Sequence, residues 1–199
     1  MILRAVCLLL ASLPVWASGA MEVKDGDIIF HRSQSRQAAA IAAATKSDYT
    51  HMGIIFFSDG SPFVYEAIQP VSRTPLEEWM KRGAGGHHVI KRLKDSSGVD
   101  FAKVKAETGK LMGRDYDWIF DWSDQKIYCS ELVWKAYKRA SGVEIGALRK
   151  LKDFDLTSET VRKLMKERYG RDIPLEMDVI APSDMFSSPK LITVGAAAP

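Results

Sequence analysis

The chain has 199 residues, of which 46% are hydrophobic and 27% charged, and its formal net charge at pH 7 is +3. A chain of this length can bury one complete hydrophobic core, and it contains no repeat, low-complexity tract or flexible linker that would indicate a second domain. Its basic residues are scattered rather than gathered along one stripe, so the charge pattern does not favour nucleic-acid binding.

Residues 1–20 have the pattern of a secretory signal peptide. Arg4 supplies a short positive region, an apolar stretch follows, and Ala17 and Ala20 offer cleavage positions. The apolar stretch is too short for a permanent membrane anchor, so we expect residues 21–199 to be exported as one domain, periplasmic or secreted, without stable membrane insertion. The alternative is that this segment forms the hydrophobic first helix of a cytosolic protein.

After residue 20, apolar residues recur with the spacing of strands or of helices, and turn residues separate these stretches. In chain order we predict a strand at 27–30, a helix at 35–45, strands at 51–57 and 63–68, a helix at 75–82, a strand at 88–93, helices at 99–112, 130–141 and 157–169, and a strand at 190–194. Ser35 is a candidate cap for the first helix, and Gly142 and Gly170 end two later helices. Strands and helices are segregated along the chain, which disfavours a doubly wound parallel sheet and predicts an α+β fold.

Loss of the signal peptide would remove Cys7 and leave Cys129 as the one cysteine of the exported chain. A single thiol in such a chain has no intramolecular disulfide partner, so it is either an inert core residue or a reactive group. Cys129 begins an apolar helical stripe that continues through Val133, Ala136 and Tyr137. At a helix start, unpaired N–H groups and the helix dipole favour a thiolate and can bind an oxyanion. The structural alternative is a cysteine that only packs in a small apolar face.

A thiol nucleophile requires a base, most often histidine, and the base requires an orienting partner. The mature chain offers His31, His51, His87 and His88. His51 begins a predicted strand and is the best placed, whereas His31 ends a strand beside Arg32, and His87 and His88 follow a glycine-rich loop. None of these groups has the spacing of metal ligands, so a metal site is poorly supported.

The tight turn predicted at residues 59–60 determines what faces His51. If the residues flanking that turn pair, Gly53 lies opposite Glu66, and His51 lies diagonally from Glu66 on the same face. Diagonal neighbours are roughly 7–8 Å apart, within reach of a glutamate and an imidazole that lean together. A slip of one residue, which Pro62 could force, would put the two side chains on opposite faces.

The residues around these positions form four short motifs, which are Gly26-Asp27-Ile28-Ile29-Phe30, Tyr49-Thr50-His51-Met52-Gly53-Ile54, Tyr65-Glu66-Ala67 and Tyr128-Cys129-Ser130-Glu131-Leu132. Together they resemble the circularly permuted branch of the NlpC-type, papain-like cysteine hydrolases, the YaeF/YiiX-like permuted amidases. The resemblance covers most of the mature chain, from Gly26 to the region of Lys190. Histidine precedes cysteine here, in the order that the permuted branch requires.

The resemblance implies that Cys129 is the nucleophile, His51 the base and Glu66 the polar residue that orients His51. It implies a small antiparallel sheet or partial barrel packed against helices, one of which carries the cysteine. It implies no cofactor or metal. Tyr49 and Ser130 flank the motif positions and are candidate substrate-binding residues. Some relatives have a histidine as the third polar group, so Glu66 is a variation within this pattern.

Three functions fit the sequence. The first is an exported thiol amidase or peptidase that forms an acyl-enzyme on cell-wall (peptidoglycan) peptides, with a D-γ-glutamyl linkage expected by analogy alone. The second keeps the chemistry but acts on a lipid ester or acyl-amide. Its groove would be lined by aromatic and methionine side chains that otherwise belong to the core: Met112, Trp118, Phe120 and Trp122. The third is a non-catalytic peptide-binding module, which a complete nucleophile, base and orienting residue argue against.

Overall fold

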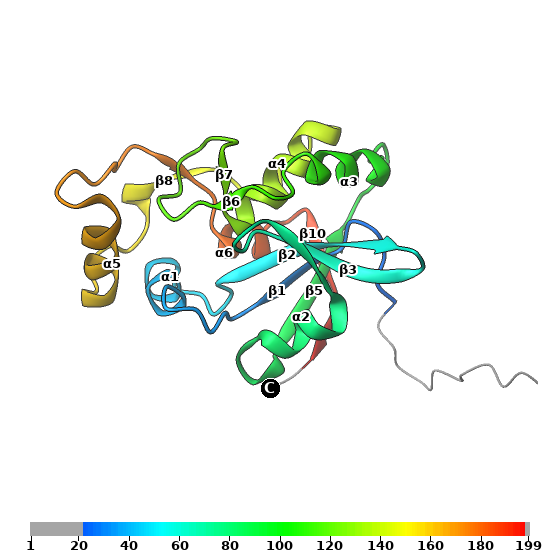
Figure 1. The fold of residues 1–199 in the computed structure, drawn as a ribbon, viewed down its shortest axis with the longest axis horizontal. Helices are drawn as coiled ribbons and strands as arrows, with labels where there is room; N and C mark the ends of the chain where they lie inside the picture. The colour runs from blue at the N-terminus through cyan, green and yellow to red at the C-terminus, as the bar shows by residue number, and fades with distance from the viewer. Residues whose placement is uncertain (1–21, 198–199) are drawn as a thin grey trace, which may run out of the picture.

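The structure is a computed structural model that describes residues 22–197. The predicted signal peptide lies outside the described residues. A six-stranded antiparallel sheet forms the centre of the molecule, in the order β10-β5-β1-β2-β3-β4 (Figure 1). Its strands are β1 (Ile28–His31), β2 (His51–Ser58), β3 (Ser61–Glu66), β4 (Ser72–Pro75), β5 (His88–Leu93) and β10 (Leu191–Ala197).

Helices and short strands connect and cover this sheet. The helices of the described residues are α1 (Ala38–Thr45), α2 (Leu76–Arg82), α3 (Phe101–Gly109), α4 (Cys129–Ser141), α5 (Glu159–Tyr169) and α6 (Pro182–Phe186), with 3-10 turns η1 (Ala84–Gly86) and η2 (Leu151–Asp153). The short strands are β6 (Asp115–Tyr116) and β7 (Lys126–Ile127), which pair in parallel, and β8 (Arg149–Lys150) and β9 (Asp178–Val179), which pair antiparallel. Within residues 22–197, no helix combines the length and the apolarity needed to cross a bilayer.

The central strands divide their apolar side chains between two cores, because successive residues of a strand point to opposite faces. Ile28 and Ile54 belong to the larger core, onto which α4 packs. Ile29 and Ile55 point to the other face, where they meet Trp79 of α2. Figure 1 shows α3 and α4 along one side of the sheet and α2 along the other. The sheet is thus covered on both faces.

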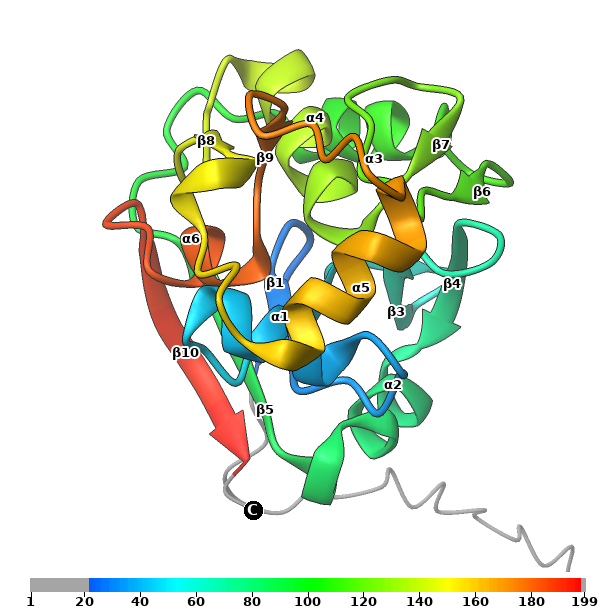
Figure 2. The same cartoon turned by 90° about the vertical axis from the view of Figure 1, so that its left-hand side faces the viewer.

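A third, smaller core lies between α1 and α5, at one end of the sheet (Figures 1 and 2). Ala40 of α1 packs there with Val161 and Met165 of α5 and with Phe154 from the preceding segment. The alanine-rich sequence of α1 allows this close approach, because its small side chains keep the two helices near each other. The chain passes from α1 directly into β2, so this core adjoins the end of the sheet where β2 begins.

The α+β prediction is confirmed, and the sheet is open rather than closed into a barrel. The hairpin prediction is also confirmed: Ser58 pairs with Ser61, and Asp59 and Gly60 both have positive φ, as a tight two-residue turn requires. The strand predicted at 88–93 has those bounds, and α4 ends at Gly142 in the left-handed conformation.

Several predicted bounds are wrong. The first helix begins at Ala38, because Ser35 lies in a turn, where its carbonyl accepts the Ala38 N–H at 3.0 Å, and its side chain makes no cap. The helix predicted at 99–112 is shorter, since Asp100 caps it by accepting a hydrogen bond from the Ala102 N–H at 3.0 Å. The last strand continues to Ala197. The sequence did not predict β4, a polar edge strand, or the five-residue helix α6.

Candidate active site

His51 and Glu66 form a hydrogen-bonded pair on the face of the sheet that α2 covers. The β2–β3 register pairs Ile54 with Tyr65, and its continuation sets Gly53 opposite Glu66, as predicted. His51 Nε2 lies 2.7 Å from Glu66 Oε2. Gly53 makes this approach possible, because a Cβ atom there would collide with the Val64 side chain and lie 2.8 Å from the Tyr65 carbonyl oxygen.

Four side chains donate hydrogen bonds to the carboxylate of Glu66, which has no solvent exposure. The His51 and Trp79 rings bind Oε2, with the Trp79 Nε1 at 2.9 Å, while Thr74 Oγ1 at 2.6 Å and the Arg82 guanidinium bind Oε1. Burial alone would raise the pKa of Glu66, but these hydrogen bonds and the neighbouring positive charges outweigh it and lower the pKa to about 2. Glu66 is therefore ionised at neutral pH.

The Cys129 side chain is the second group that acts strongly on the His51 ring. Because Nε2 is engaged by Glu66, Nδ1 is the nitrogen left for the thiol. Burial by itself lowers the pKa of His51, but the adjacent Cys129 side chain, the hydrogen bond to Glu66 and the charges on both groups outweigh it and raise the pKa to about 9. The arrangement therefore favours a protonated imidazole between a carboxylate and a sulfur.

The start of α4 determines the position of the thiol. Tyr128, the residue before the helix, has an extended backbone, and its N–H donates a hydrogen bond to Glu131 Oε2 at 3.2 Å. Cys129 is the first helical residue and is 5% exposed, while Val133 and Ala136 continue its stripe into the main core. The first N–H groups of a helix have no partner within it, so they are available beside the sulfur.

His31 neighbours His51 but has a different environment. Its ring stacks on Trp79, with centroids 3.9 Å apart, and lies 5.3 Å from the His51 ring. Burial and the nearby positive charges of His51 and Arg82 lower the pKa of His31 to about 3. His31 is therefore neutral beside a protonated His51, and it packs against the imidazole rather than exchanging protons with it.

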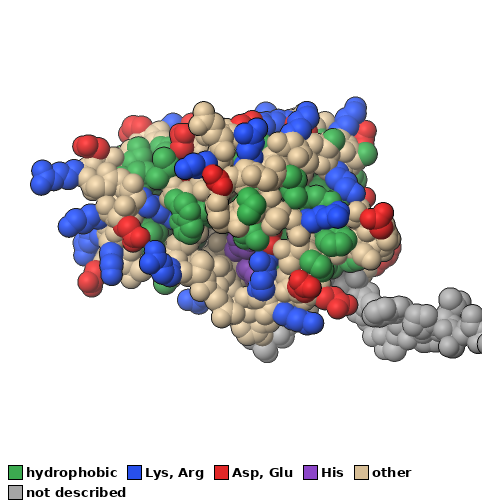
Figure 3. Space-filling model, in the orientation of Figure 1, with side chains coloured by type: hydrophobic (Ala, Val, Ile, Leu, Met, Phe, Trp, Pro, Cys, Tyr) green, Lys and Arg blue, Asp and Glu red, His purple; other side chains and the backbone are tan. Residues whose placement is uncertain are grey.

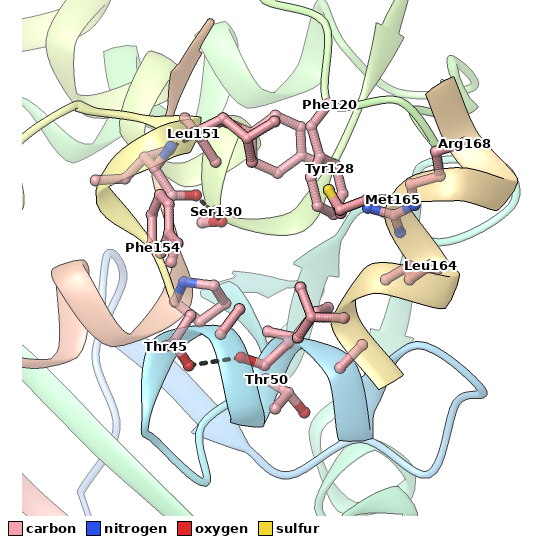
Figure 4. Close-up of a pocket in the computed structure, with 18 of the residues that line it drawn as sticks. Thr45, Thr50, Phe120, Tyr128, Ser130, Leu151, Phe154, Leu164, Met165 and Arg168 are labelled. Carbon is pink, nitrogen blue, oxygen red and sulfur yellow. Dashed lines mark hydrogen bonds between the residues drawn. The ribbon is translucent and has the colours of Figure 1, made fainter. Parts of the chain in front are cut away.

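An apolar cavity of about 60 Å³ adjoins Cys129 (Figure 4). It lies between the start of α4 and the small α1–α5 core, and Arg168 of α5 extends into it. Phe120 lines this cavity, as the groove prediction required, whereas Met112 and Trp122 pack against the main core. The other lining residues are mainly aliphatic or aromatic and include Tyr128, Leu151, Phe154, Leu164 and Met165.

A larger cleft of about 480 Å³ opens on the His51 side of the site. His31, Gln37, Arg82 and Trp118 line it, and Trp118 is 55% exposed. Figure 3 shows histidine side chains in a hollow near the middle of this face, with a basic side chain beside them. Polar residues predominate among those that line the cleft, whereas the cavity at the thiol is lined mainly by apolar ones.

Tyr116 belongs to the linings of both the cavity and the cleft. Its hydroxyl oxygen accepts a hydrogen bond from Gln37 Nε2 at 2.9 Å. Burial, followed by the charge on Cys129, raises the pKa of Tyr116 well above its ordinary value, so the phenol stays protonated. Sequence reasoning missed this residue, because a tyrosine in a two-residue strand carries no local signal of catalysis.

The two candidate substrate-binding residues occupy different places. Ser130 lines the cavity but donates its hydroxyl hydrogen to the Ile180 carbonyl at 2.7 Å, which ties α4 to the segment before α6. Tyr49 stacks on Phe186 with centroids 3.8 Å apart and is not among the residues that line the cavity or the cleft. Substrate binding by either residue stays a prediction.

A family model for permuted papain-like amidases, the YaeF/YiiX or C92 family, matches residues 22–195. The chain therefore belongs to this family of cysteine amidases, as the motif resemblance predicted. It is 43% identical over 187 residues to the uncharacterized protein YiiX of Escherichia coli K12, with 94% of this chain and 91% of that protein covered.

The crystal structure of YiiX from Escherichia coli O157:H7 is similar to this fold, with a TM-score of 0.84 and 42% identity, over 88% of this chain and 98% of that one. That protein is described as a metalloprotein. In residues 22–197 of the present chain, no three His, Cys, Asp or Glu side chains converge in a way that could hold a metal ion, so this part of the chain offers no ligand set for one.

Proposed function

We propose that this protein is an exported cysteine amidase that uses Cys129, His51 and Glu66 and cleaves cell-wall peptides. The observation that carries the proposal is the His51 ring, which is 2.7 Å from the Glu66 carboxylate and has its pKa raised by the neighbouring Cys129 side chain. A nucleophile, a base and a buried orienting group in this order form the arrangement used by thiol hydrolases on several folds.

In the first half of the reaction, the sulfur of Cys129 attacks the amide carbonyl carbon while its proton resides on His51. The Cys129 backbone N–H, at the start of α4, and the Tyr116 hydroxyl stabilise the oxyanion that forms. His51 then gives its proton to the leaving amine, the C–N bond breaks, and a thioester remains on Cys129.

In the second half, neutral His51 takes a proton from water as the water oxygen attacks the thioester. The C–S bond breaks, the carboxylic acid product leaves, and the sulfur recovers the pairing with the protonated His51. Glu66 keeps the imidazole in the tautomer with hydrogen on Nε2 throughout, because the ionised carboxylate can only accept from that nitrogen.

Cell-wall peptides are the first substrate class to test, because the predicted signal peptide would bring the enzyme to them. The purified mature chain is incubated with muropeptides beside Cys129→Ala, and new amines and carboxylates are identified by mass spectrometry. The proposal expects products from the wild type alone. Equal product from both proteins would count against the thiol chemistry, and no product from either would count against this substrate class.

A lipid ester or acyl-amide is the second candidate, favoured by the apolar cavity beside Cys129. An acyl group on the sulfur could extend between Phe120 and the α1–α5 core without placing polar atoms among apolar side chains. Turnover of phospholipids or N-acyl amides that disappears in Cys129→Ala would favour this candidate. Enlarging Ala44 in the lining to leucine should then slow long-chain substrates more than acetyl ones.

A further inference from the structure

Arg168, Gln37 and Tyr116 form a hydrogen-bond chain that starts on α5 and ends beside the thiol. The Arg168 Nη2 donates to Gln37 Oε1, and Gln37 Nε2 donates to the Tyr116 hydroxyl oxygen at 2.9 Å. We infer that this chain aims the Tyr116 hydroxyl hydrogen at the oxyanion, with Gln37 and Arg168 as positioning residues. The inference rests on the proposed function, because it concerns the tetrahedral intermediate on Cys129.

The direction of the chain follows from which atoms can donate. A guanidinium has donors only, so the carbonyl end of Gln37 must face Arg168 and the amide nitrogen must face Tyr116. The Tyr116 oxygen therefore accepts, and its own hydrogen is left for another group. Without the cation, the Gln37 amide could turn over and take that hydrogen with its carbonyl oxygen. Arg168 thus keeps the phenol hydrogen available.

The position of Tyr116 in the site suits its hydroxyl hydrogen to the oxyanion that forms at Cys129. Tyr116 borders both the cavity at Cys129 and the cleft at His51, and the charge of Cys129 acts on its hydroxyl, so the two side chains are neighbours in the site. Within residues 22–197, the hydroxyl oxygen receives the Gln37 bond and no protein acceptor takes its hydrogen. A donor that is already oriented, and is protonated at neutral pH, does not have to reorganise as charge develops on the oxygen.

The charge of Asp117 and the ring of Phe120 also favour a cation at this place, but neither accepts a hydrogen bond from Arg168 among the described residues. Its guanidinium lies 4.2 Å from the Phe120 ring centroid, and its Nε and Nη1 are buried without a hydrogen-bond partner among the described residues. Figure 4 shows the side chain extending from α5 into an otherwise apolar cavity. Its one hydrogen bond in this part of the chain goes to Gln37. The packing of α1 on α5 holds both ends of that bond.

A double-mutant cycle tests the chain, with hydrolysis of a p-nitrophenyl acyl ester by the mature enzyme as the measured rate. Tyr116→Phe should lower kcat by about 10²-fold, as removal of one oxyanion donor does elsewhere. Arg168→Met should lower kcat about 10-fold with little change in KM, and should have no further effect when Tyr116 is already phenylalanine. Arg162→Met, at an exposed position of the same helix, is the matched control and should leave the rate unchanged.

Gln37→Glu separates positioning from packing. A glutamate of the same size forms an ion pair with Arg168, so the thermal midpoint should be maintained, but its carboxylate accepts the Tyr116 hydrogen and should lower kcat about 10-fold. In the Tyr116→Phe background this substitution should have no further effect. Wild-type kcat in Gln37→Glu, or the same loss from Arg168→Met in both backgrounds, would overturn the inference. A rise in KM alone would instead show that Arg168 contacts substrate. If the wild type and every variant hydrolyse the ester no faster than Cys129→Ala, the proposed function is overturned together with this inference.

Discussion

Glu66 Oε2 lies 2.7 Å from His51 Nε2, and the Glu66 side chain has no solvent exposure. The two residues lie on the paired strands β3 and β2, with Gly53 between them. The carboxylate is ionised there because four donors surround it, two of which, His51 and Arg82, carry positive charge. An ionised, buried acceptor fixes both the tautomer and the orientation of the imidazole. The site is therefore organised from the β2–β3 hairpin and α2 before any substrate arrives.

Replacing Glu66 by glutamine keeps the shape of the side chain and removes its charge. We expect Glu66→Gln to lower kcat/KM by about 10²-fold, at the lower end of what general acid–base catalysis supplies, because the protonated imidazole loses its counter-charge. Steady-state rates on the same ester measure the effect. Glu78→Gln, on the exposed side of α2, is the control. Equal rates in the two variants would remove Glu66 from the mechanism.

The activity of the wild type should fall at alkaline pH. Burial alone would lower the pKa of His51, but the adjacent Cys129 side chain and the hydrogen bond to Glu66 raise it to about 9. Below that pH the imidazole carries the proton that the leaving amine needs, and above it the proton is lost. The kcat/KM profile on an amide substrate should therefore decline through pH of about 9. In Glu66→Gln the decline should move to lower pH, since one group that favours the charged form is gone. A profile that still rises past that pH would contradict the assignment.

The Cys129 thiol should be alkylated quickly in a way that depends on His51. In a chain of residues 21–199, iodoacetamide at neutral pH should react faster with Cys129 than with a model thiol, because the neighbouring imidazole can take the thiol proton as the sulfur attacks. His51→Ala should slow the reaction about 10-fold or more, while circular dichroism shows an unchanged fold. A rate no faster than the model thiol would favour the non-catalytic binding module.

Gly53 should not tolerate a side chain. A Cβ atom there would collide with Val64 and approach the Tyr65 carbonyl oxygen, so Gly53→Ala should reduce the free energy of unfolding by about 1–3 kcal/mol, as overpacking does in other cores. It should also lower activity, because the strand that carries Glu66 must shift. Gly109→Ala is the control, since nothing lies within 4 Å of its added Cβ atom. Denaturant unfolding that gives the same stability for both variants would show that β3 can move freely.

Local signals were enough to predict the hairpin that pairs His51 with Glu66. A two-residue turn at 59–60 sets the register, and a period of two then places both side chains on one face. The start of α4 could also be predicted, because an apolar stripe began at Cys129 and a glycine ended it at Gly142. These features depend on residues close together in the chain.

The rest of the site depends on contacts that no local pattern contains. Arg82 and Trp79 reach Glu66 from α2, and the Arg168–Gln37–Tyr116 chain joins α5, the start of α1 and a short strand. The sequence separation of Gln37 and Arg168 is 131 residues. Only the packing of α1 on α5 brings such residues together, so their roles follow from the fold and not from spacing.

The protonation state of His51 can be measured in the free enzyme. Histidine-labelled protein is titrated by NMR, with His51 assigned by its absence in His51→Ala, and the pKa of its imidazole is read from the ring resonances. We expect a pKa of about 9 in the wild type and a lower value in Glu66→Gln. A His51 ring that titrates at or below the ordinary histidine value, unchanged by Glu66→Gln, would contradict it.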